Sequence, residues 1–430
     1  MRTTPFAAAL VATPAALALV LAPAAAAETS TAAVPQAGYV AAQLDAGGDR
    51  LIADYDGQQY DDLGLTLDAV MSLTAAKSAD DQATASMAYV IDNAGSYYGY
   101  GEDVYANATA KLLTAVTVRG LDPTDVGGVD LVTTLQGLEA ESGQFQDRSQ
   151  WGDYSNTLGQ SFALIGLKRA GVNPSTAAVD FLLAQQCTDG GFSLQYEDGC
   201  VSDPDATALA VQGLTAVGGQ DAAVARAADY LASKQGADGG VSGGTTTEGA
   251  NGNSTGLASV AFRLAGRTAN HDQAVAYLQD LTLGCEYTNL AGGIAYSPTA
   301  KRDLEAAGTD APVDDQTTRT TAQALIGLTG FSYIDASPAG ATTETIIDVC
   351  EEPTEEPTSP TPTPTTPSET PTSEPRPSDE EPVRPEVVQT DSRQGSLSPL
   401  LVGLGALGLL LGGLFATPTA ARVRRGGTHR

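Results

Sequence analysis

Aspartates that could take part in acid–base chemistry lie among aromatic residues in this 430-residue sequence. A carboxylic acid can donate a proton to a bound molecule, and a second carboxylate can take one from water. A single acid at the start of a helix has a simpler role as an N-cap, and this is the role that we expect for Asp205. The four catalytic candidates are Asp205, Asp203, Asp62 and Asp153.

Aromatic residues concentrate in segments between the apolar helical runs. Such side chains either fill the core where a ring of helices closes or form the walls of a site for a glycan, a peptide or a flat cofactor. Both interpretations stay open at this point. The candidates for ligand binding are Tyr98, Tyr100, Trp151, Tyr154, Phe192, Tyr196 and Tyr296.

Histidine content and charge exclude several classes of function. Zinc sites draw on His and Cys, and the chain has two histidines, of which only His271 precedes the C-terminal tail. Asp54 and Asp56 alone do not make a calcium loop. We therefore expect no metal and no cofactor. The net charge of −30 argues against nucleic acid as a partner.

A repeated unit of helix, glycine turn and helix must position these residues. Its sharpest copy is Gln186-Cys187-Thr188-Asp189-Gly190-Gly191-Phe192, and the second is Gln235-x-x-Asp238-Gly239-Gly240-Val241. A glycine pair ends the first helix because glycine permits a positive φ and a close backbone approach. Six such units of roughly 50 residues account for residues 28–342.

The two helices of each unit differ in polarity. Residues 221–234 carry one apolar stripe, as an outer helix would, whereas residues 206–214 are apolar or small nearly all round, as in a helix buried on most sides. Six outer helices around six inner ones predict an all-α (α/α)6 barrel, with an open superhelix as the alternative. The expected inner-helix caps are Asp62, Asn107, Asn156, Asp205, Asn253 and Asp315.

The two sharp copies resemble the Gln-x-x-Asp-Gly-Gly-Trp repeat of terpene cyclases and protein prenyltransferases. Gly292-Gly293-Ile294-Ala295-Tyr296 and Gly143-Gln144-Phe145 are similar to degenerate copies. The resemblance covers roughly residues 35–335 and implies an α/α toroid. The same superfamily includes cobalamin carriers and complement thioester domains, so the resemblance implies a fold and leaves the function open.

The chemistries that this resemblance implies match the sequence incompletely. Class II cyclases use the middle acid of an Asp-x-Asp-Asp-Thr-Ala motif, and Asp203-Pro204-Asp205-Ala206-Thr207-Ala208 keeps that acid but not the next one. An aromatic content of 6% with one Trp argues against a carbocation cavity. The prenyltransferase zinc ligands and the thioester motif are missing, and Glu286 follows Cys285. Cobalamin carriers add a β-rich second domain, which we do not expect here because the chain after Thr342 reads as a stalk.

The ends of the chain predict export and anchoring. Residues 1–27 read as a signal peptide, and residues 343–396 are rich in Pro, Thr, Ser and Glu, which is typical of an extended, solvated stalk. Residues 397–418 are apolar over about 20 positions and predict a transmembrane helix, followed by a basic tail at 419–430. We expect a single-pass cell-membrane protein with its N-terminal domain outside the cell.

Four cysteines in an exported chain predict two disulfides. Three pairings are possible. Cys187 with Cys200 would close the sharpest glycine turn, and Cys285 with Cys350 would join the end of the domain to its last unit.

These features predict a monomeric, membrane-anchored surface module. It would bind a small molecule, a glycan or a protein partner at an aromatic and acidic barrel mouth without catalysis. The first alternative is an extracellular enzyme, either an inverting glycosidase with an acid pair or a divergent terpene cyclase that uses Asp205. The further alternative is a cobalamin-carrier-like binding domain.

Overall fold

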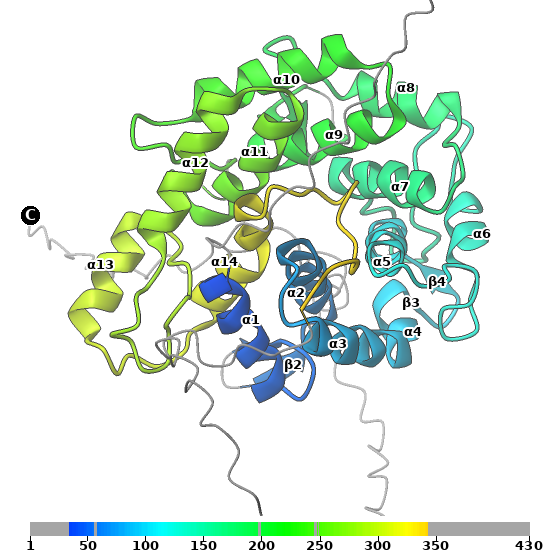
Figure 1. The fold of residues 1–430 in the computed structure, drawn as a ribbon. Helices are drawn as coiled ribbons and strands as arrows, with labels where there is room; N and C mark the ends of the chain where they lie inside the picture. The colour runs from blue at the N-terminus through cyan, green and yellow to red at the C-terminus, as the bar shows by residue number, and fades with distance from the viewer. Residues whose placement is uncertain (1–33, 56–57, 197–198, 245–246, 248, 343–430) are drawn as a thin grey trace, which may run out of the picture.

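A computed structural model describes residues 34–342, except for 56–57, 197–198, 245–246 and 248. Within this part the chain is mostly helical, and its helices form an inner and an outer layer around one centre (Figure 1). The predicted signal peptide, stalk, transmembrane helix and basic tail lie outside the described residues. Among the described helices, none combines the length and the apolar character needed to cross a bilayer.

The inner layer is a closed ring. Each inner helix packs against the next one along the chain, and the last packs against the first, which excludes the open superhelix. Closure requires backbones to approach, because a Cβ on Gly256 would stand 2.6 Å from Ala324 Cα. The inner helices are α2 (Leu63–Ala76), α5 (Ala106–Val118), α7 (Thr157–Arg169), α9 (Pro204–Val217), α11 (Gly252–Leu264) and α14 (Asp315–Ala324), which continues as the 3-10 turn η2 (Leu325–Leu328).

The outer helices bury one stripe each, as their pattern predicts. In α10 the buried positions include Val224, Ala228 and Leu231, and the opposite side faces solvent. The outer layer consists of α1 (Val34–Ala46), α3 (Asp80–Asp92), α6 (Leu131–Gln136), α8 (Thr176–Ala184), α10 (Asp221–Lys234) and α12 (Thr268–Leu281). Two further helices are α4 (Ala94–Tyr98) and α13 (Pro298–Ala307).

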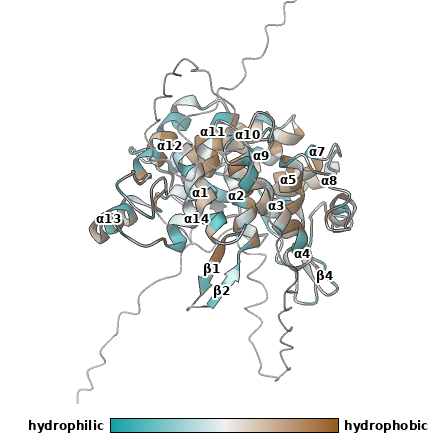
Figure 2. Ribbon diagram, turned by 60° about the horizontal axis from the view of Figure 1, so that its bottom comes forward, coloured by the Kyte–Doolittle hydropathy of each residue, from teal (hydrophilic) through white to brown (hydrophobic). Residues whose placement is uncertain are grey.

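Three small antiparallel hairpins connect outer helices to inner ones, and the sequence analysis did not predict them. The paired strands are β1 (Ile52–Tyr55) with β2 (Gln58–Asp61), β3 (Gly99–Tyr100) with β4 (Asp103–Val104), and β5 (Phe192–Ser193) with β6 (Ser202–Asp203). Figure 2 shows the β1–β2 hairpin projecting beyond the helices on the same side as α4 and β4. The ends of the inner helices on that side are therefore surrounded by loops.

The glycine motif joins three elements. The Gln186 amide donates to Gly190 O within the turn and to Ala223 O at the start of the next outer helix, both at 2.9 Å. Asp189 Oδ1 accepts from Gly191 N at 3.1 Å and holds the turn shut. Gly190 has φ +95° and lies against the backbone of α10 at Arg226, where a side chain would not fit. The motif is thus architectural.

A threonine in the inner helix also holds the glycine turn in place. Thr207 accepts a hydrogen bond from Phe192 N, the residue that ends the glycine turn, and donates to Asp203 O four residues back. The same pair of bonds recurs in other units, and in the unit of α7 a glutamine amide oxygen takes the acceptor role. The repeated acceptors are Thr66 from Leu51, Thr255 from Val241, Thr321 from Ile294 and Gln160 from Phe145.

The predicted disulfide between Cys187 and Cys200 is present, with the two Cα atoms 5.5 Å apart. It closes the sharpest glycine turn together with the β5–β6 hairpin. The second predicted pair stays a prediction, because Cys350 lies outside the described residues.

A glycine that packs against a neighbouring helix should tolerate substitution less well than one that faces open space. Gly239→Ala puts a Cβ 2.1 Å from Gln273 O of α12 at φ +90°, whereas Gly171 at φ +78° has no atom within 4 Å of the added Cβ. We expect Gly171→Ala to cost about 1–2 kcal/mol of unfolding free energy and Gly239→Ala clearly more. Urea unfolding of both variants measures this. Equal losses would contradict the packing role of the motif.

Candidate functional site

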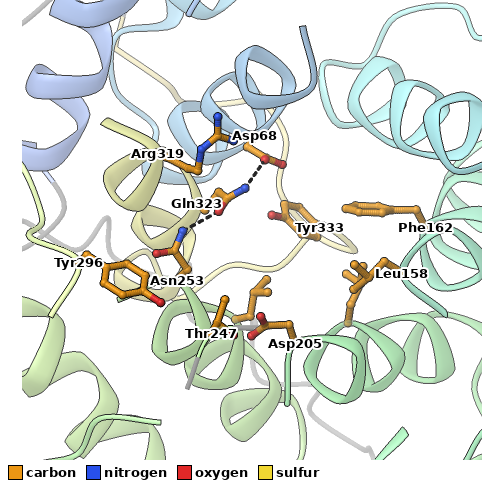
Figure 3. Close-up of a pocket in the computed structure, with 12 residues that line it drawn as sticks. Asp68, Leu158, Phe162, Asp205, Thr247, Asn253, Tyr296, Arg319, Gln323 and Tyr333 are labelled. Atoms are coloured by element: carbon orange, nitrogen blue, oxygen red, sulfur yellow. Dashed lines mark hydrogen bonds between the residues drawn. The ribbon is translucent and has the colours of Figure 1, made fainter. Parts of the chain in front are cut away.

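A small chamber lies inside the inner ring. Its volume is about 40 Å³, enough for one or two water molecules. The side chains that surround it (Figure 3) come from five of the six inner helices, all except α5, and from three connecting segments. The lining residues are Asp68, Leu158, Phe162, Asp205, Leu209, Thr247, Asn253, Leu257, Tyr296, Arg319, Gln323 and Tyr333.

Asp205 lies in this chamber and is not the helix cap that we predicted. Asp203 caps α9 instead, because its Oδ1 accepts from Ala206 N at 2.9 Å. Pro204 explains the shift: proline is favoured at the first helical position, which makes the residue before it the cap. The sequence therefore contained the signal. With Asp203 as the cap, Asp205 has no role in ending the helix.

The other predicted caps divide in the same way. Asp62 and Asn156 cap α2 and α7 as predicted. The remaining three predictions are wrong by one or two residues, since the helices start earlier than expected. The caps are Tyr105 for α5, without a side-chain bond, Asn251 for α11 and Asp314 for α14, in place of Asn107, Asn253 and Asp315.

The Asp205 carboxyl is buried with little compensation. Its Oδ1 makes no hydrogen bond, and the charged group that acts on it is another acid, Asp203. Burial, and then the charge of Asp203, raises the pKa of Asp205 to about 7, and the nearby Ser254 hydroxyl opposes this only in part. Burial also raises the pKa of Asp203. Asp205 is therefore a neutral acid below about pH 7.

A second buried carboxylate lies on α2, across the ring from α9. Asp68 Oδ1 pairs with Lys111 Nζ at 2.7 Å, and both side chains are almost completely buried. Asp68 Oδ2 accepts from the Gln323 amide at 3.0 Å, and Gln323 accepts from Asn253 at 2.6 Å (Figure 3). This network was not predicted, although a lysine and an aspartate inside apolar helices are a visible signal in the sequence.

Aromatic rings close the chamber at its inner end. Phe162 of α7 packs against Tyr333 with ring centroids 5.5 Å apart. Tyr333 follows η2 in the chain, and its backbone N–H donates to the Gln212 amide oxygen of α9 at 3.1 Å. The chamber is thus apolar on one side and polar on the side of Asn253 and Arg319 (Figure 3).

Of the predicted ligand-binding residues, the structure places one in the chamber, which is Tyr296. Phe192 is fully buried in the core, and Tyr196 packs edge to face against Phe181 at 4.9 Å. Three others are well exposed, and Tyr98 is half-buried at the end of α4. The exposed fractions are 73% for Tyr100, 49% for Trp151 and 51% for Tyr154.

The remaining acid candidates take part in structural interactions. Asp62 caps α2 and pairs with Arg319 at 2.8 Å. Asp153 accepts from the backbone of Asp147 and Ser155, each at 3.0 Å. Neither lines the chamber with Asp205. Within the described residues, no group of three or more His, Cys, Asp or Glu side chains is arranged to hold a metal ion.

Comparisons with known proteins give structural neighbours and no sequence relatives. No family model matches the sequence, and no curated protein matches it either. A protein from Actinoplanes shares 18% identity over 68% of this chain and 98% of its own, with a TM-score of 0.49. The type II terpene cyclase MstE from Scytonema (13% identity, 68% and 96% coverage, TM-score 0.48) and a glycosidase (14%, 68% and 95%, TM-score 0.46) are also similar. At these values no activity or residue role is carried over.

The buried ion pair should be costly to break from one side. Lys111→Met leaves the Asp68 carboxylate buried without its partner, and we expect a loss of about 3–5 kcal/mol of unfolding free energy. Adding Asp68→Asn should recover a large part of it, because no unpaired charge remains. Urea unfolding of both single variants and the double variant tests this. Lys168→Met on the surface is the control, and it should change the unfolding free energy by no more than about 0.5 kcal/mol. If the loss in the double variant equals the sum of the losses in Asp68→Asn and Lys111→Met, the two side chains are not coupled and the prediction is wrong.

The raised pKa of Asp205 makes stability depend on pH. The folded protein keeps a proton that the unfolded chain releases above about pH 4. The unfolding free energy of the wild type should therefore fall between about pH 4 and pH 7, by up to about 4 kcal/mol from this group, given its pKa of about 7. Asp205→Asn has no such proton, so its stability relative to wild type should grow as the pH rises over this range.

Asp130→Asn provides the control for this pH titration. Asp130 is exposed at the N-cap of α6, and the Thr133 hydroxyl, which hydrogen-bonds to it, lowers its pKa. A lowered pKa stabilises the fold at high pH and is lost as the pH falls. Above about pH 4 Asp130 is ionised in both the folded and the unfolded state, so the difference between Asp130→Asn and wild type should stay nearly constant over the range in which the Asp205→Asn difference changes. The measurement is urea unfolding from pH 4 to pH 8. If the difference in unfolding free energy between Asp205→Asn and wild type does not change with pH, Asp205 is ionised in the folded protein.

Proposed function

We propose that the protein is an enzyme that acts on a small, mostly apolar molecule in the central chamber, with Asp205 as its general acid. The chamber of about 40 Å³ must widen to admit such a molecule. The observation that carries this proposal is the buried Asp205 carboxyl, which has no partner at Oδ1, faces the chamber and is not needed as a helix cap. A group that costs stability without a structural return is a candidate for function.

The chemistry of the chamber supports proton donation. A general acid works best when its pKa lies near the working pH, and the pKa of Asp205 is raised to about 7. Leu158, Leu209 and Leu257 line the walls and would hold an apolar substrate away from water. A carbon–carbon double bond or an ether oxygen is the kind of group that such an acid would protonate.

Once the proton has been transferred, the surroundings of Asp205 would stabilise the product of that step. Asp205 becomes a carboxylate beside the positive charge that it has created. The faces of Phe162 and Tyr333 lie within the same chamber and can contribute cation–π attraction. Return of a proton to Asp205, from the substrate or from water, completes the cycle and leaves no net redox change.

A non-catalytic surface module remains the second candidate, favoured by the exposed aromatics. Tyr100 and Trp151 lie on two segments that are joined by the Val104–Arg148 backbone bridge, and Gln150 N bonds to Asp103 at 2.9 Å. Fixed, exposed aromatic rings suit a glycan or a protein partner. In either case we place a monomeric domain outside the cell, held at the membrane by residues 397–418.

Proton transfer can be read directly in heavy water. We would incubate the protein with isoprenoid alkenes in D₂O and measure deuterium in the products by mass spectrometry, with glycan hydrolysis as a parallel assay. Wild type should incorporate deuterium, and Asp205→Asn should lower the rate by at least about 100-fold, which is the scale of general-acid contributions. Glu305→Gln on the exposed part of α13 is the control and should leave the rate unchanged.

The alternatives give other outcomes. Reaction without loss in Asp205→Asn would remove the general-acid role. Absence of any turnover, together with glycan binding that Trp151→Ala abolishes, would favour the surface module. Cobalamin binding measured by the shift of its absorbance would support the carrier-like alternative.

A further inference from the structure

The segment from Thr329 to Thr342, which we name the strap, crosses one end of the inner ring. Figure 1 shows it in yellow, passing over the centre of the ring between α14 and the α2–α3 turn. Its contacts are with the C-terminal ends of inner helices, namely Arg169 of α7, Arg263 of α11 and Lys77 after α2. The strap therefore closes the end of the barrel opposite to the N-caps.

Arg169 holds the strap with its whole guanidinium group. Nη1 donates to Tyr333 O and Ile334 O at 3.1 and 2.5 Å, and Nη2 donates to Ala336 O at 2.9 Å. The remaining donors bond to Thr117 of α5, through Oγ1 at 3.3 Å and through O at 2.8 Å. All five N–H groups of the side chain are used. Three carbonyls of the strap are thus fixed to two inner helices.

Further anchors lie on both sides of this clamp. Lys77 Nζ donates to Ser337 O and lies 4.9 Å from the centre of the Phe331 ring. At the end of the strap, Thr342 N donates to Lys77 O at 3.0 Å. Asp335 accepts from Ser332 N at 2.6 Å and folds the segment back on itself. The backbone on each side of Tyr333 is therefore held in place.

The Tyr333 side chain is the part of the strap that enters the chamber. It is almost fully buried and forms the inner end of the chamber with Phe162. The leucines of the walls, such as Leu158 and Leu209, lie in the first half of their helices. Gln212, which accepts from Tyr333 N, lies in the second half of α9. Tyr333 thus forms the chamber wall on the side of the strap.

We propose that Tyr333 is a specificity-determining residue that sets the depth to which a ligand can enter, and that the strap holds it there as a fixed stop. The inference rests on the proposed function in one respect, that ligands occupy the chamber from the side of the N-caps. Its consequence concerns the substrate class. The protein selects compact apolar molecules and excludes those with a long unbranched chain.

A fixed stop follows from the way the backbone is held. A side chain on a loose loop would move aside when a longer ligand arrived. Here the N–H and the carbonyl of Tyr333 are both hydrogen-bonded to inner helices, through Gln212 and Arg169. Retreat of the ring would require several of these bonds to break together, with their polar groups left buried.

Straight-chain 1-alkanols from butanol to decanol measure the depth. The full-length chain would be titrated by calorimetry as wild type, Tyr333→Phe and Tyr333→Ala. Each additional methylene that is buried strengthens binding about fourfold. In wild type and Tyr333→Phe this gain should stop at the same short chain length, or no alkanol should bind. In Tyr333→Ala it should continue for several more methylenes.

Phe262→Ala is the matched control, because Phe262 is a fully buried ring of α11 that does not line the chamber. It should lose stability and keep the wild-type length limit. Should Tyr333→Ala fail to fold, Tyr333→Leu retains an apolar side chain and should still extend the limit. The same limit in all variants, or no binding in any of them, would overturn the proposal.

The alkanol series and the proton-transfer assay fail independently. Asp205→Asn should keep the length limit of the wild type, since depth is set by the strap and not by the acid. A length limit that shifts with Tyr333 but no deuterium transfer would leave the stop in place and remove the enzyme. Deuterium transfer by the wild type, together with an unchanged alkanol length limit in Tyr333→Ala, would support the enzyme and remove the role of Tyr333 as a stop.

Discussion

An inner helix of a closed ring is enclosed on every side, and this constraint governs the rest of the structure. A buried polar group without a partner costs about 1–3 kcal/mol, so a polar side chain on these helices is stabilised when it finds a partner inside the protein. The threonines meet this demand by bonding to the glycine turns, and Thr207 is one of them. Lys111 and Asp68 meet it by pairing with each other.

Asp205 stands out against this background. It occupies the same enclosed setting, yet Asp203 performs the capping, and the charge of Asp203 raises the pKa of Asp205 further. The protein loses stability by burying an acid at the edge of a chamber. Thr157 Oγ1, Gln212 Nε2 and Ser254 Oγ are also buried without a partner, but among the described residues Asp205 is the one acid in this group, and it lines the chamber. We therefore interpret Asp205 as the mark of a functional site.

The last described segment covers one end of the ring (Figure 1). Arg169 and Gln212 use side chains on inner helices to hold the strap, and the strap places Tyr333 at the inner end of the chamber. The size of the chamber is therefore decided by residues that are far apart in the sequence. The glycine turns and the disulfide between Cys187 and Cys200 set the outer frame, whereas the strap sets the interior.

The sequence by itself determined the layered architecture and the architectural role of the glycine motif. Apolar periodicity and glycine turns are local features, and they depend on backbone preferences that do not need the fold. Helix starts were less certain, because several Asp and Asn residues compete as caps; Pro204 would have resolved the case of Asp205. Only the tertiary structure decided that Asp205 is buried with no partner at Oδ1, that Asp68 meets Lys111, and that Tyr333 closes the chamber. Burial and pairing arise between helices that are distant in sequence, and no local pattern encodes them.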